Sequence, residues 1–168
     1  MDIIYDGIIS SLQKNGGITV YFKELLSRIS PDDFRWYQYD DKFSDIGPSN
    51  SVTLSPRFLE RYRDFFVTDL IDSQIYDNSI FHSSYYRIPK IKLPTVTTVH
   101  DFTYERFIQG PAKWVHSWQK KRAIDNSDLV ICVSENTAKD LQIFCAVPDN
   151  KIRIIYNGVS KEYYPLNE

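Results

Sequence analysis

Residues 128–144 read DLVICVSENTAKDLQIF, a stretch that combines a buried strand with the start of a helix. The nearly continuous apolar run over 128–133 is typical of a strand covered on both faces of a parallel sheet. Ser134 is a good N-cap, and the helix that it begins is predicted over 135–144. A strand that leads directly into a helix is the repeating unit of α/β folds.

The rest of the chain continues this alternation of strands and helices. Hydrophobic periodicity predicts further helices over 18–29, 56–73 and 111–126. It predicts further strands over 2–5, 34–39, 52–54, 79–82, 94–100 and 151–156, with 94–100 near the centre of the sheet. The sequence therefore predicts an α/β fold, a Rossmann-like, doubly wound and mostly parallel sheet with helices on both faces. Folds of this kind bind ligands outside the carboxyl ends of their strands.

The composition is that of one soluble globular domain. The 168 residues include 20 basic and 22 acidic side chains, and this net charge of −2 argues against a nucleic-acid-binding protein that depends on bulk positive charge. No apolar run has the length of a membrane-spanning helix, and the first six residues carry no signal-peptide pattern. The two cysteines are too few for a disulfide framework or a cysteine-rich zinc site. We therefore expect a cytoplasmic protein with no nucleic-acid partner.

A glycine-containing loop follows the first strand. Residues 6–17 end in Gly16 and Gly17 and open directly into the helix predicted over 18–29. Glycine lets a backbone approach a ligand closely, and the free N–H groups of a helix N-terminus attract phosphate. The spacing matches neither the dinucleotide fingerprint nor the P-loop. Two interpretations stay open at this point: a phosphate cradle and a simple turn.

Polar residues also stand at the carboxyl ends of three later strands. His100 and Asp101 end the central strand, where a histidine that titrates near neutral pH lies beside a carboxylate that can orient it. His82 ends the preceding strand and is a candidate for the same crevice, and Ser134 presents a hydroxyl at the next strand end. The alternative is that His100 only bonds a neighbouring loop and that Ser134 only caps its helix.

The sequence offers no metal-binding pattern. It contains no Asp-x-Asp motif and no His, Cys or Glu cluster with metal-ligand spacing, and no Ser–His–Asp or Cys–His arrangement can be assigned. We therefore expect no metal and no other cofactor. Backbone amides and basic side chains would then meet the charge of a nucleotide diphosphate.

Basic and aromatic residues are interleaved in three segments, 57–63, 85–92 and 111–126. The last places Lys113, His116 and Lys120 on one helix face and Trp114 and Trp118 on another. This composition suits an anionic membrane surface or a phosphorylated lipid. The alternative is a solvated face, with His116 in water, above a core face that carries the tryptophans.

Five motifs resemble those of family 4 glycosyltransferases, which are retaining enzymes of the GT-B fold. They are Gly16-Gly17-Ile18 followed by Tyr21-Phe22 and Leu25-Leu26, Phe81-His82 with Tyr85-Tyr86, Thr97-Thr98-Val99-His100-Asp101, Val133-Ser134-Glu135-Asn136-Thr137, and Ile155-Tyr156-Asn157-Gly158-Val159. They occur in the family's order and span nearly the whole chain. The chain most resembles the N-terminal, acceptor-side domain of bacterial members that build O-antigen, lipopolysaccharide, capsule or other surface polysaccharides.

This resemblance implies one half of a two-domain enzyme. It implies a Rossmann-like N-terminal domain over 1–156 and the start of an interdomain linker over 157–168, with the donor-binding domain and its Glu-x7-Glu motif outside this chain. The implied activity is that of a hexosyltransferase-type enzyme that retains anomeric configuration without a metal. We expect the fragment alone to be inactive.

The resemblance also implies roles for individual residues. Gly16 and Gly17 would present amides to the donor diphosphate, His100 would lie beside the transferring sugar, and Asp101 would shape its loop. Cleft-lining positions would be Ser134 and His82, and acceptor-side positions would be Tyr85, Tyr86 and Arg87. The implied partners are a nucleotide-sugar donor, bound mainly by the second domain, and a saccharide or lipid-linked saccharide acceptor. Peripheral contact with an anionic membrane, on the inner face of the cell membrane, is a further expectation.

Two other classes of function stay open from the sequence alone. One is a nonenzymatic module that binds a phosphorylated sugar or a nucleotide through the glycine loop. The other is a domain that docks on a membrane or a partner protein through its aromatic and basic helices. A dehydrogenase fits poorly, because the glycine fingerprint and the acidic ribose-binding residue are not in place.

Overall fold

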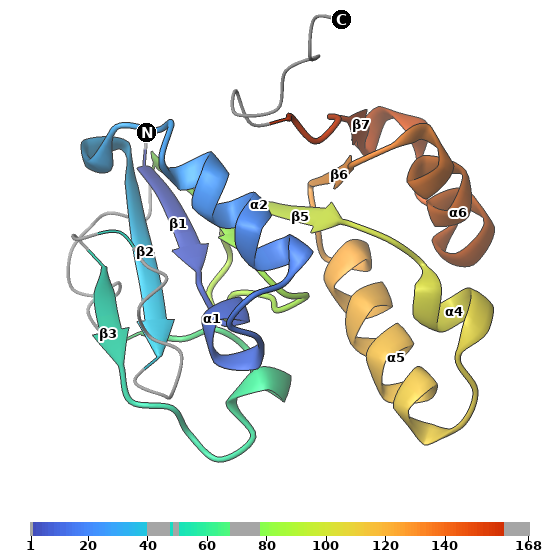
Figure 1. Ribbon diagram of the computed structural model, residues 1–168, viewed down its shortest axis with the longest axis horizontal. Coiled ribbons are helices and arrows are strands. Elements are labelled where there is room, and N and C mark those ends of the chain that lie inside the picture. The colour runs from blue at the N-terminus through green and yellow to red at the C-terminus, as the bar shows by residue number, and fades with distance from the viewer. Residues whose placement is uncertain (1, 40–47, 49–50, 68–77, 160–168) are drawn as a thin grey trace, which may run out of the picture.

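The computed structural model describes residues 2–39, 48, 51–67 and 78–159 (Figure 1). Its strands are β1 Asp2–Asp6, β2 Phe34–Tyr39, β3 Val52–Leu54, β4 Ser79–Ser83, β5 Thr95–Val99, β6 Leu129–Cys132 and β7 Ile152–Ile154. Its α-helices are α1 Ile9–Leu12, α2 Gly17–Leu26, α4 Thr103–Phe107, α5 Pro111–Asp125 and α6 Glu135–Cys145. Three 3-10 turns cover Pro31–Asp33, Glu60–Tyr62 and Asp149–Lys151.

The strands form one sheet in the order β3-β2-β1-β4-β5-β6-β7. Every neighbouring pair is parallel. The chain leaves β1 toward one edge of the sheet, and β4 begins the half that grows toward the other edge. The topological switch point therefore lies between the ends of β1 and β4, where folds of this class bind ligands. The predicted α/β, doubly wound parallel sheet is confirmed, with β5 among the inner strands as expected.

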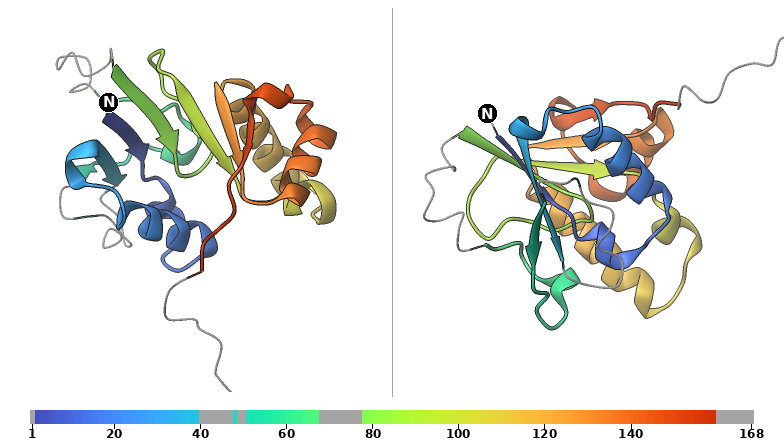
Figure 2. Two further views of the ribbon diagram at one scale, coloured as in Figure 1. Left: turned by 90° about the horizontal axis from the view of Figure 1, so that it is seen from above. Right: turned by 60° about the vertical axis from the view of Figure 1, so that its left-hand side comes forward.

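The helices cover both faces of the sheet (Figure 2). Phe22 and Leu26 of α2 pack on Tyr5 and Trp36 on one face. Residues of α5 and α6 pack on Val99, Val130 and Cys132 on the other face. Neighbouring residues of a strand point to opposite faces, so the pairing of Tyr5 with His82 puts His82 on the α2 face.

The helix predicted over 56–73 is wrong for residues 56–67, and residues 68–73 lie outside the described part of the chain. Leu59 adopts a left-handed backbone with φ of 56°, which interrupts a helix. Phe65 instead bridges to Pro89 in extended conformation, with backbone bonds to Ile88 and Lys90. The apolar spacing of this segment suited a helix, but a 3-10 turn at Glu60–Tyr62 and long-range pairing at Phe65 form there instead.

Helix α5 forms where it was predicted, but its faces are the reverse of the solvated-face interpretation. His116 and Lys120 are buried, whereas Trp114 and Trp118 are 76% and 57% exposed. His116 stacks on Tyr104 at 4.0 Å between ring centroids, so the expectation of a histidine in water is wrong. Polar partners from α4 and from the loop after β4 stabilise the buried side chains of this face. The hydrophobic periodicity of the α5 sequence cannot detect such partners.

Candidate functional site

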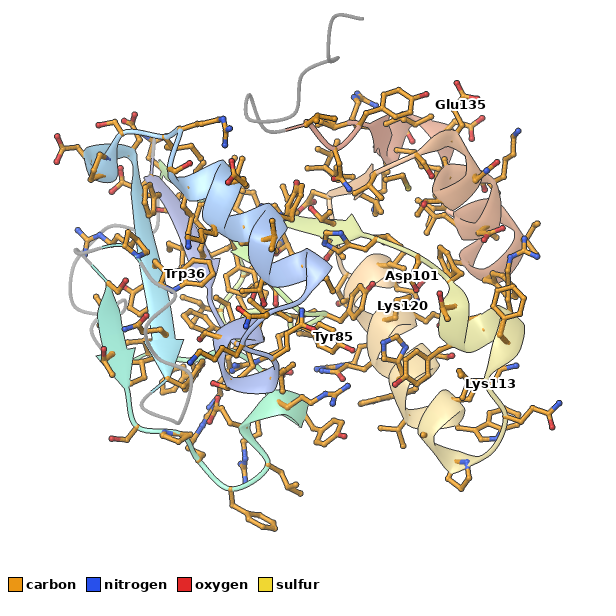
Figure 3. The ribbon with its side chains drawn as sticks, in the orientation of Figure 1. Trp36, Tyr85, Asp101, Lys113, Lys120 and Glu135 are labelled. Carbon is orange, nitrogen blue, oxygen red and sulfur yellow. The ribbon has the colours of Figure 1, made fainter. Side chains whose placement is uncertain are left out.

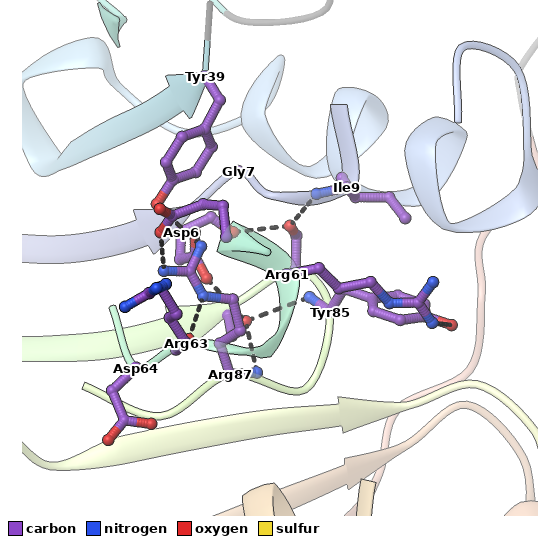
Figure 4. Close-up of polar contacts among 12 residues, drawn as sticks. Asp6, Gly7, Ile9, Tyr39, Arg61, Arg63, Asp64, Tyr85 and Arg87 are labelled. Carbon is purple, nitrogen blue, oxygen red and sulfur yellow. Dashed lines mark hydrogen bonds and ion pairs between the residues drawn. The ribbon is translucent and has the colours of Figure 1, made fainter. Parts of the chain in front are cut away.

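The loops after β1 and β4 are tied together at the switch point (Figure 4). The Ser84 hydroxyl donates to the Asp6 carbonyl at 2.6 Å and accepts from the Ile9 amide at 3.0 Å. The Ser83 hydroxyl accepts from the amides of Tyr85 and Arg87. These bonds give the edge of the sheet a defined backbone on which side chains can be placed.

A buried ion network occupies the face of this edge opposite α2. The Arg87 guanidinium contacts Asp6 at 3.3 Å and Glu60 at 2.8 Å, and donates to the Tyr39 hydroxyl at 2.8 Å. Asp6, Arg87 and Glu60 are all nearly inaccessible. Burial raises the pKa of Asp6, while the Arg87 charge opposes this effect. Because its donors are committed to these partners, the network acts as a closed structural element.

A second polar layer lies on the α2 face, and we call it the histidine layer: His82, Thr98, Tyr21 and His100. His82 Nε2 lies 2.9 Å from Thr98 Oγ1, and an interaction with the same Thr98 side chain lowers the pKa of Tyr21, against the larger effect of burial. The Tyr21 ring meets the His100 ring edge to face at 5.0 Å. Helix α2 and strands β4 and β5 thus bring together residues that lie far apart in the sequence. Burial lowers the pKa of both His82 and His100 to about 4, so both rings are neutral at pH 7.

His100 is the member of this layer with an unused buried atom. Its Nε2 is inaccessible and has no hydrogen-bond partner among the described residues. Its carbonyl accepts from the Thr137 hydroxyl at 3.3 Å, which ties the end of β5 to α6. His82, by contrast, is enclosed between Tyr5 and Phe22, so it supports the layer from below and does not line an open surface.

A groove of about 590 Å³ runs along the outer side of α2. Its walls are α2 and the segment 155–159 that leaves β7, and its lining includes Gly17, Tyr21, Glu24 and Arg28. One side of the Tyr21 side chain therefore faces the groove, and its ring also contacts the His100 ring. Sequence reasoning placed Gly17 here but missed Tyr21, although Tyr21 belongs to a motif that supported the family resemblance.

The glycine loop ends at the N-terminus of α2, as predicted. Gly16 is the N-cap, with φ of −150° and ψ of 164°, and Gly17 is the first helical residue. Among the described glycines only Gly110 has positive φ, so Gly16 and Gly17 do not adopt a left-handed conformation. A Cβ at Gly17 would meet nothing within 4 Å, whereas one at Gly16 would approach the Gln13 side chain. The space at Gly17 is open toward the groove that it lines.

Asp101 and Ser134 both act as caps. The Asp101 carboxylate accepts from the Thr103 amide at 2.9 Å at the start of α4. The Ser134 hydroxyl accepts from the Thr137 amide at 3.1 Å, which confirms its predicted capping of α6. The Asp101 backbone carbonyl also accepts a hydrogen bond from the Lys120 ammonium at 2.8 Å, and Figure 3 labels both residues.

The three predicted acceptor-side residues differ in accessibility. Tyr85 is half-buried, and its hydroxyl meets His116 at 3.0 Å and Arg61 at 3.3 Å. Tyr86 is buried in the core with φ of 50°, and Arg87 lies in the ion network. Only Tyr85 of the three reaches the surface in this conformation.

Sequence reasoning also missed a cluster around Glu105, because its members come from α4 and α5. The Lys120 ammonium contacts Glu105 at 2.8 Å and the Asp101 carbonyl at 2.8 Å. Burial alone would raise the pKa of Glu105, but contacts with His116 and Lys120 lower it to about 2. This cluster anchors the loop that carries His100 and Asp101 to α5.

The described residues contain neither a metal-binding cluster nor a membrane-spanning helix. No group of three or more His, Cys, Asp or Glu side chains is arranged to hold a metal ion within them. None of the helices in these residues has the length and apolar character to cross a bilayer.

Comparison with known proteins places the chain in a family. A search of curated proteins finds no match. The family model described as Glycosyltransferase Family 4 matches residues 43–163, which is well over half of the chain and includes His82, His100 and Ser134. Gly16 and Gly17 lie outside that range, so their assignment depends on the geometry of α2. With this match and the parallel α/β sheet, the chain belongs to glycosyltransferase family 4.

Proposed function

We propose that the chain is the acceptor-side domain of a retaining, metal-independent glycosyltransferase. The complete enzyme moves a hexose from a nucleotide-sugar to a saccharide or lipid-linked saccharide, in the synthesis of O-antigen, capsule or a related polysaccharide at the inner face of the cell membrane. Residues 1–156 form the domain, 157–168 begin a linker, and a second domain outside this chain holds most of the donor. The observation that carries the proposal is the groove lined by Gly17 and Tyr21, together with the contact between the Tyr21 ring and the His100 ring.

The N-terminus of α2 suits the donor diphosphate. The first intrahelical bond runs from the Val20 amide to the Gly16 carbonyl, so the amides before Val20 have no helical partner. These donors and the helix dipole favour a negative charge at this end. With no side chain at Gly17, a phosphate can approach the backbone from the groove.

His100 suits contact with the transferring sugar. Because burial lowers its pKa to about 4, the ring is neutral at pH 7 and has one N–H donor and one acceptor nitrogen. A sugar hydroxyl that reaches one of these nitrogens can bond to it, and such a bond gains strength as charge develops at the anomeric centre. The departing diphosphate would take the acceptor proton, as the resemblance to the retaining enzymes of family 4 implies.

The experiment compares the isolated chain with the same chain joined to its donor domain. Nucleoside diphosphates with different bases are added to the isotope-labelled chain, and amide shifts are followed by NMR. We expect weak binding with shifts at residues 17–19, no transfer by the chain alone, and retaining transfer without added metal by the joined protein. Binding without transfer by the joined protein would instead support the nonenzymatic module. Shifts confined to residues far from α2 would contradict the proposed diphosphate site.

A specific surface also supports the expected membrane contact. We call it the aromatic–basic surface: Trp114, Trp118, Phe144, Lys113 and Lys121. Trp114 and Phe144 line a hollow of about 290 Å³ together with both lysines. Exposed tryptophans beside cations match the interface of an anionic bilayer, where indole rings and lysine side chains both find favourable positions.

Vesicle sedimentation tests this contact. We expect the chain to bind phosphatidylglycerol-containing vesicles and not phosphatidylcholine vesicles. Replacing both tryptophans (Trp114→Glu and Trp118→Glu) should weaken binding about tenfold or more. Phe58→Glu is the matched control, because Phe58 is 81% exposed but lies outside this surface. Equal loss in the control, or equal binding to both vesicles, would exclude a role specific to the aromatic–basic surface.

A further inference from the structure

The histidine layer forms a continuous chain of contacts from the core to the edge of the groove. It begins at His82, whose ring packs against Tyr5 at 5.4 Å and Phe22 at 5.5 Å between centroids. His82 Nε2 then meets the Thr98 hydroxyl at 2.9 Å, and the Thr98 side chain interacts with Tyr21 and lowers its pKa. Tyr21 ends the chain against the His100 ring.

The buried pair His82–Thr98 and the half-buried Tyr21 differ in how firmly packing holds them. His82 and Thr98 are buried in neighbouring central strands, where packing and the sheet ladder hold them. Tyr21 borders an open groove, and without an anchor its ring could turn about χ1. The Thr98 side chain, which interacts with the Tyr21 hydroxyl, can supply that anchor, so that half-buried Tyr21 takes its position from the buried pair.

We propose that Tyr21 is a positioning residue for His100, and that the His82–Thr98 pair fixes Tyr21. The edge-to-face contact, at an interplanar angle of 82°, restricts the His100 ring to one orientation. The inference rests on the proposed function in one respect, which is the role of His100 beside the transferring sugar. Its structural part concerns this chain alone.

The groups that face His100 are Tyr21 from α2, His82 from β4 and its own neighbour Asp101. Burial disfavours the charged ring and Asp101 favours it, with burial the larger effect. Loss of the Tyr21 anchor admits water to His100 and weakens the burial effect. The position of Tyr21 therefore has a direct readout in the titration of His100.

The first experiment follows the His100 ring protons of the isolated chain by NMR as the pH is varied. Tyr21→Phe keeps the aromatic ring but removes the hydroxyl, and Thr98→Val removes the other partner with little change in shape. We expect both variants to raise the pKa of His100 from about 4 toward the ordinary 6.5 and to broaden its ring signals. Tyr5→Phe is the control, because it removes a hydroxyl from the same face of the sheet and leaves Tyr21 and Thr98 both unchanged. Thermal melts of each variant establish that the fold is retained.

The second experiment measures kinetics after the chain is joined to its donor domain. Tyr21→Phe should lower kcat about tenfold with little change in the KM for the donor, because orientation is lost and binding is not. Unchanged His100 titration in both folded variants, or an equal change in Tyr5→Phe, would overturn the positioning role. A changed titration with unchanged kcat would leave Tyr21 positioning His100 and would refute the role of His100 in transfer.

Discussion

The ion network around Arg87 and the histidine layer lie at the same edge of the sheet but on opposite faces. In the ion network, formal charges are buried and each is matched by an opposite charge at 2.8–3.3 Å. In the histidine layer the rings are neutral, and His100 keeps a buried nitrogen without a partner among the described residues. A ligand could bind the first cluster only by breaking strong pairs, whereas it can bind beside the second without such a cost. The comparison separates residues that hold the switch point together from those available for chemistry.

Removal of Arg87 should have the largest effect on stability. Arg87→Met leaves Asp6 and Glu60 buried without their shared cation, so we expect a loss of about 3–5 kcal/mol in the free energy of unfolding. Urea denaturation measures the loss. The control is Arg28→Met, which breaks an exposed pair with Glu24 and should change stability by less than about 0.5 kcal/mol. Equal effects would mean that the ion network is not the structural element inferred from its burial.

Acid should weaken the fold through the histidine layer. The folded-state pKa of His82 and of His100 is about 4 against an ordinary 6.5, so between these values the unfolded chain binds more protons. Stability is therefore full above pH 6.5 and falls as the pH decreases toward 4, by about 3 kcal/mol for both together between about pH 7 and 5. The raised pKa of Asp6 acts in the opposite direction, because that contribution is lost as the pH rises.

Urea denaturation of the wild type and of His82→Asn across this pH range measures the histidine contribution. The variant should lose part of the pH dependence, because asparagine does not titrate. If its slope equals that of the wild type, burial does not keep the His82 ring neutral in the folded protein.

Removal of His100 should affect transfer more than folding. In the protein joined to the proposed donor domain, His100→Ala should lower kcat about 100-fold, or about 2.7 kcal/mol, with a smaller change in donor KM. Steady-state kinetics with a thermal melt of the same variant separate the two effects. Wild-type kcat in a folded variant would mean that His100 has a structural role only. The histidine layer would then not differ in function from the ion network.

Substitution at Gly17 should have the smallest effect on the fold while still affecting the ligand. Gly17→Val projects into open space beside the α2 N-terminus, so stability should change by less than about 0.5 kcal/mol. Diphosphate affinity should fall by about 1–3 kcal/mol, measured by calorimetric titration of the joined protein.

Gly7→Ala provides the contrasting variant. Its Cβ would overlap the buried Trp36 ring, so it should destabilise the fold by about 1–3 kcal/mol. If Gly17→Val destabilises as much as Gly7→Ala and leaves affinity unchanged, the glycine loop is only a turn.

Local signals in the sequence were sufficient for most of the fold. Apolar runs marked the strands, and β/α alternation indicated a parallel sheet whose ligands meet the strand ends. Ser134 marked the start of α6, and Gly16 and Gly17 marked the start of α2. Each signal depends on a few adjacent residues and on the backbone conformations that they favour. His100 could be singled out for the same reason, because it directly follows a recognisable strand.

Only the tertiary structure decided which side chains meet. Arg87 reaches Asp6 across 81 positions of sequence and Glu60 across 27, and neither pairing has a local pattern. The same holds for Tyr21 with Thr98 and for α5, whose buried face carries His116 and Lys120 because Tyr85 and Glu105 arrive there to bond them. Periodicity reports which residues share a face, but burial of a polar face depends on partners brought from elsewhere in the chain. The sequence by itself therefore determined the helices and strands and their order. Packing between distant elements decided which polar residues pair with one another and which keep a group that a ligand can bind.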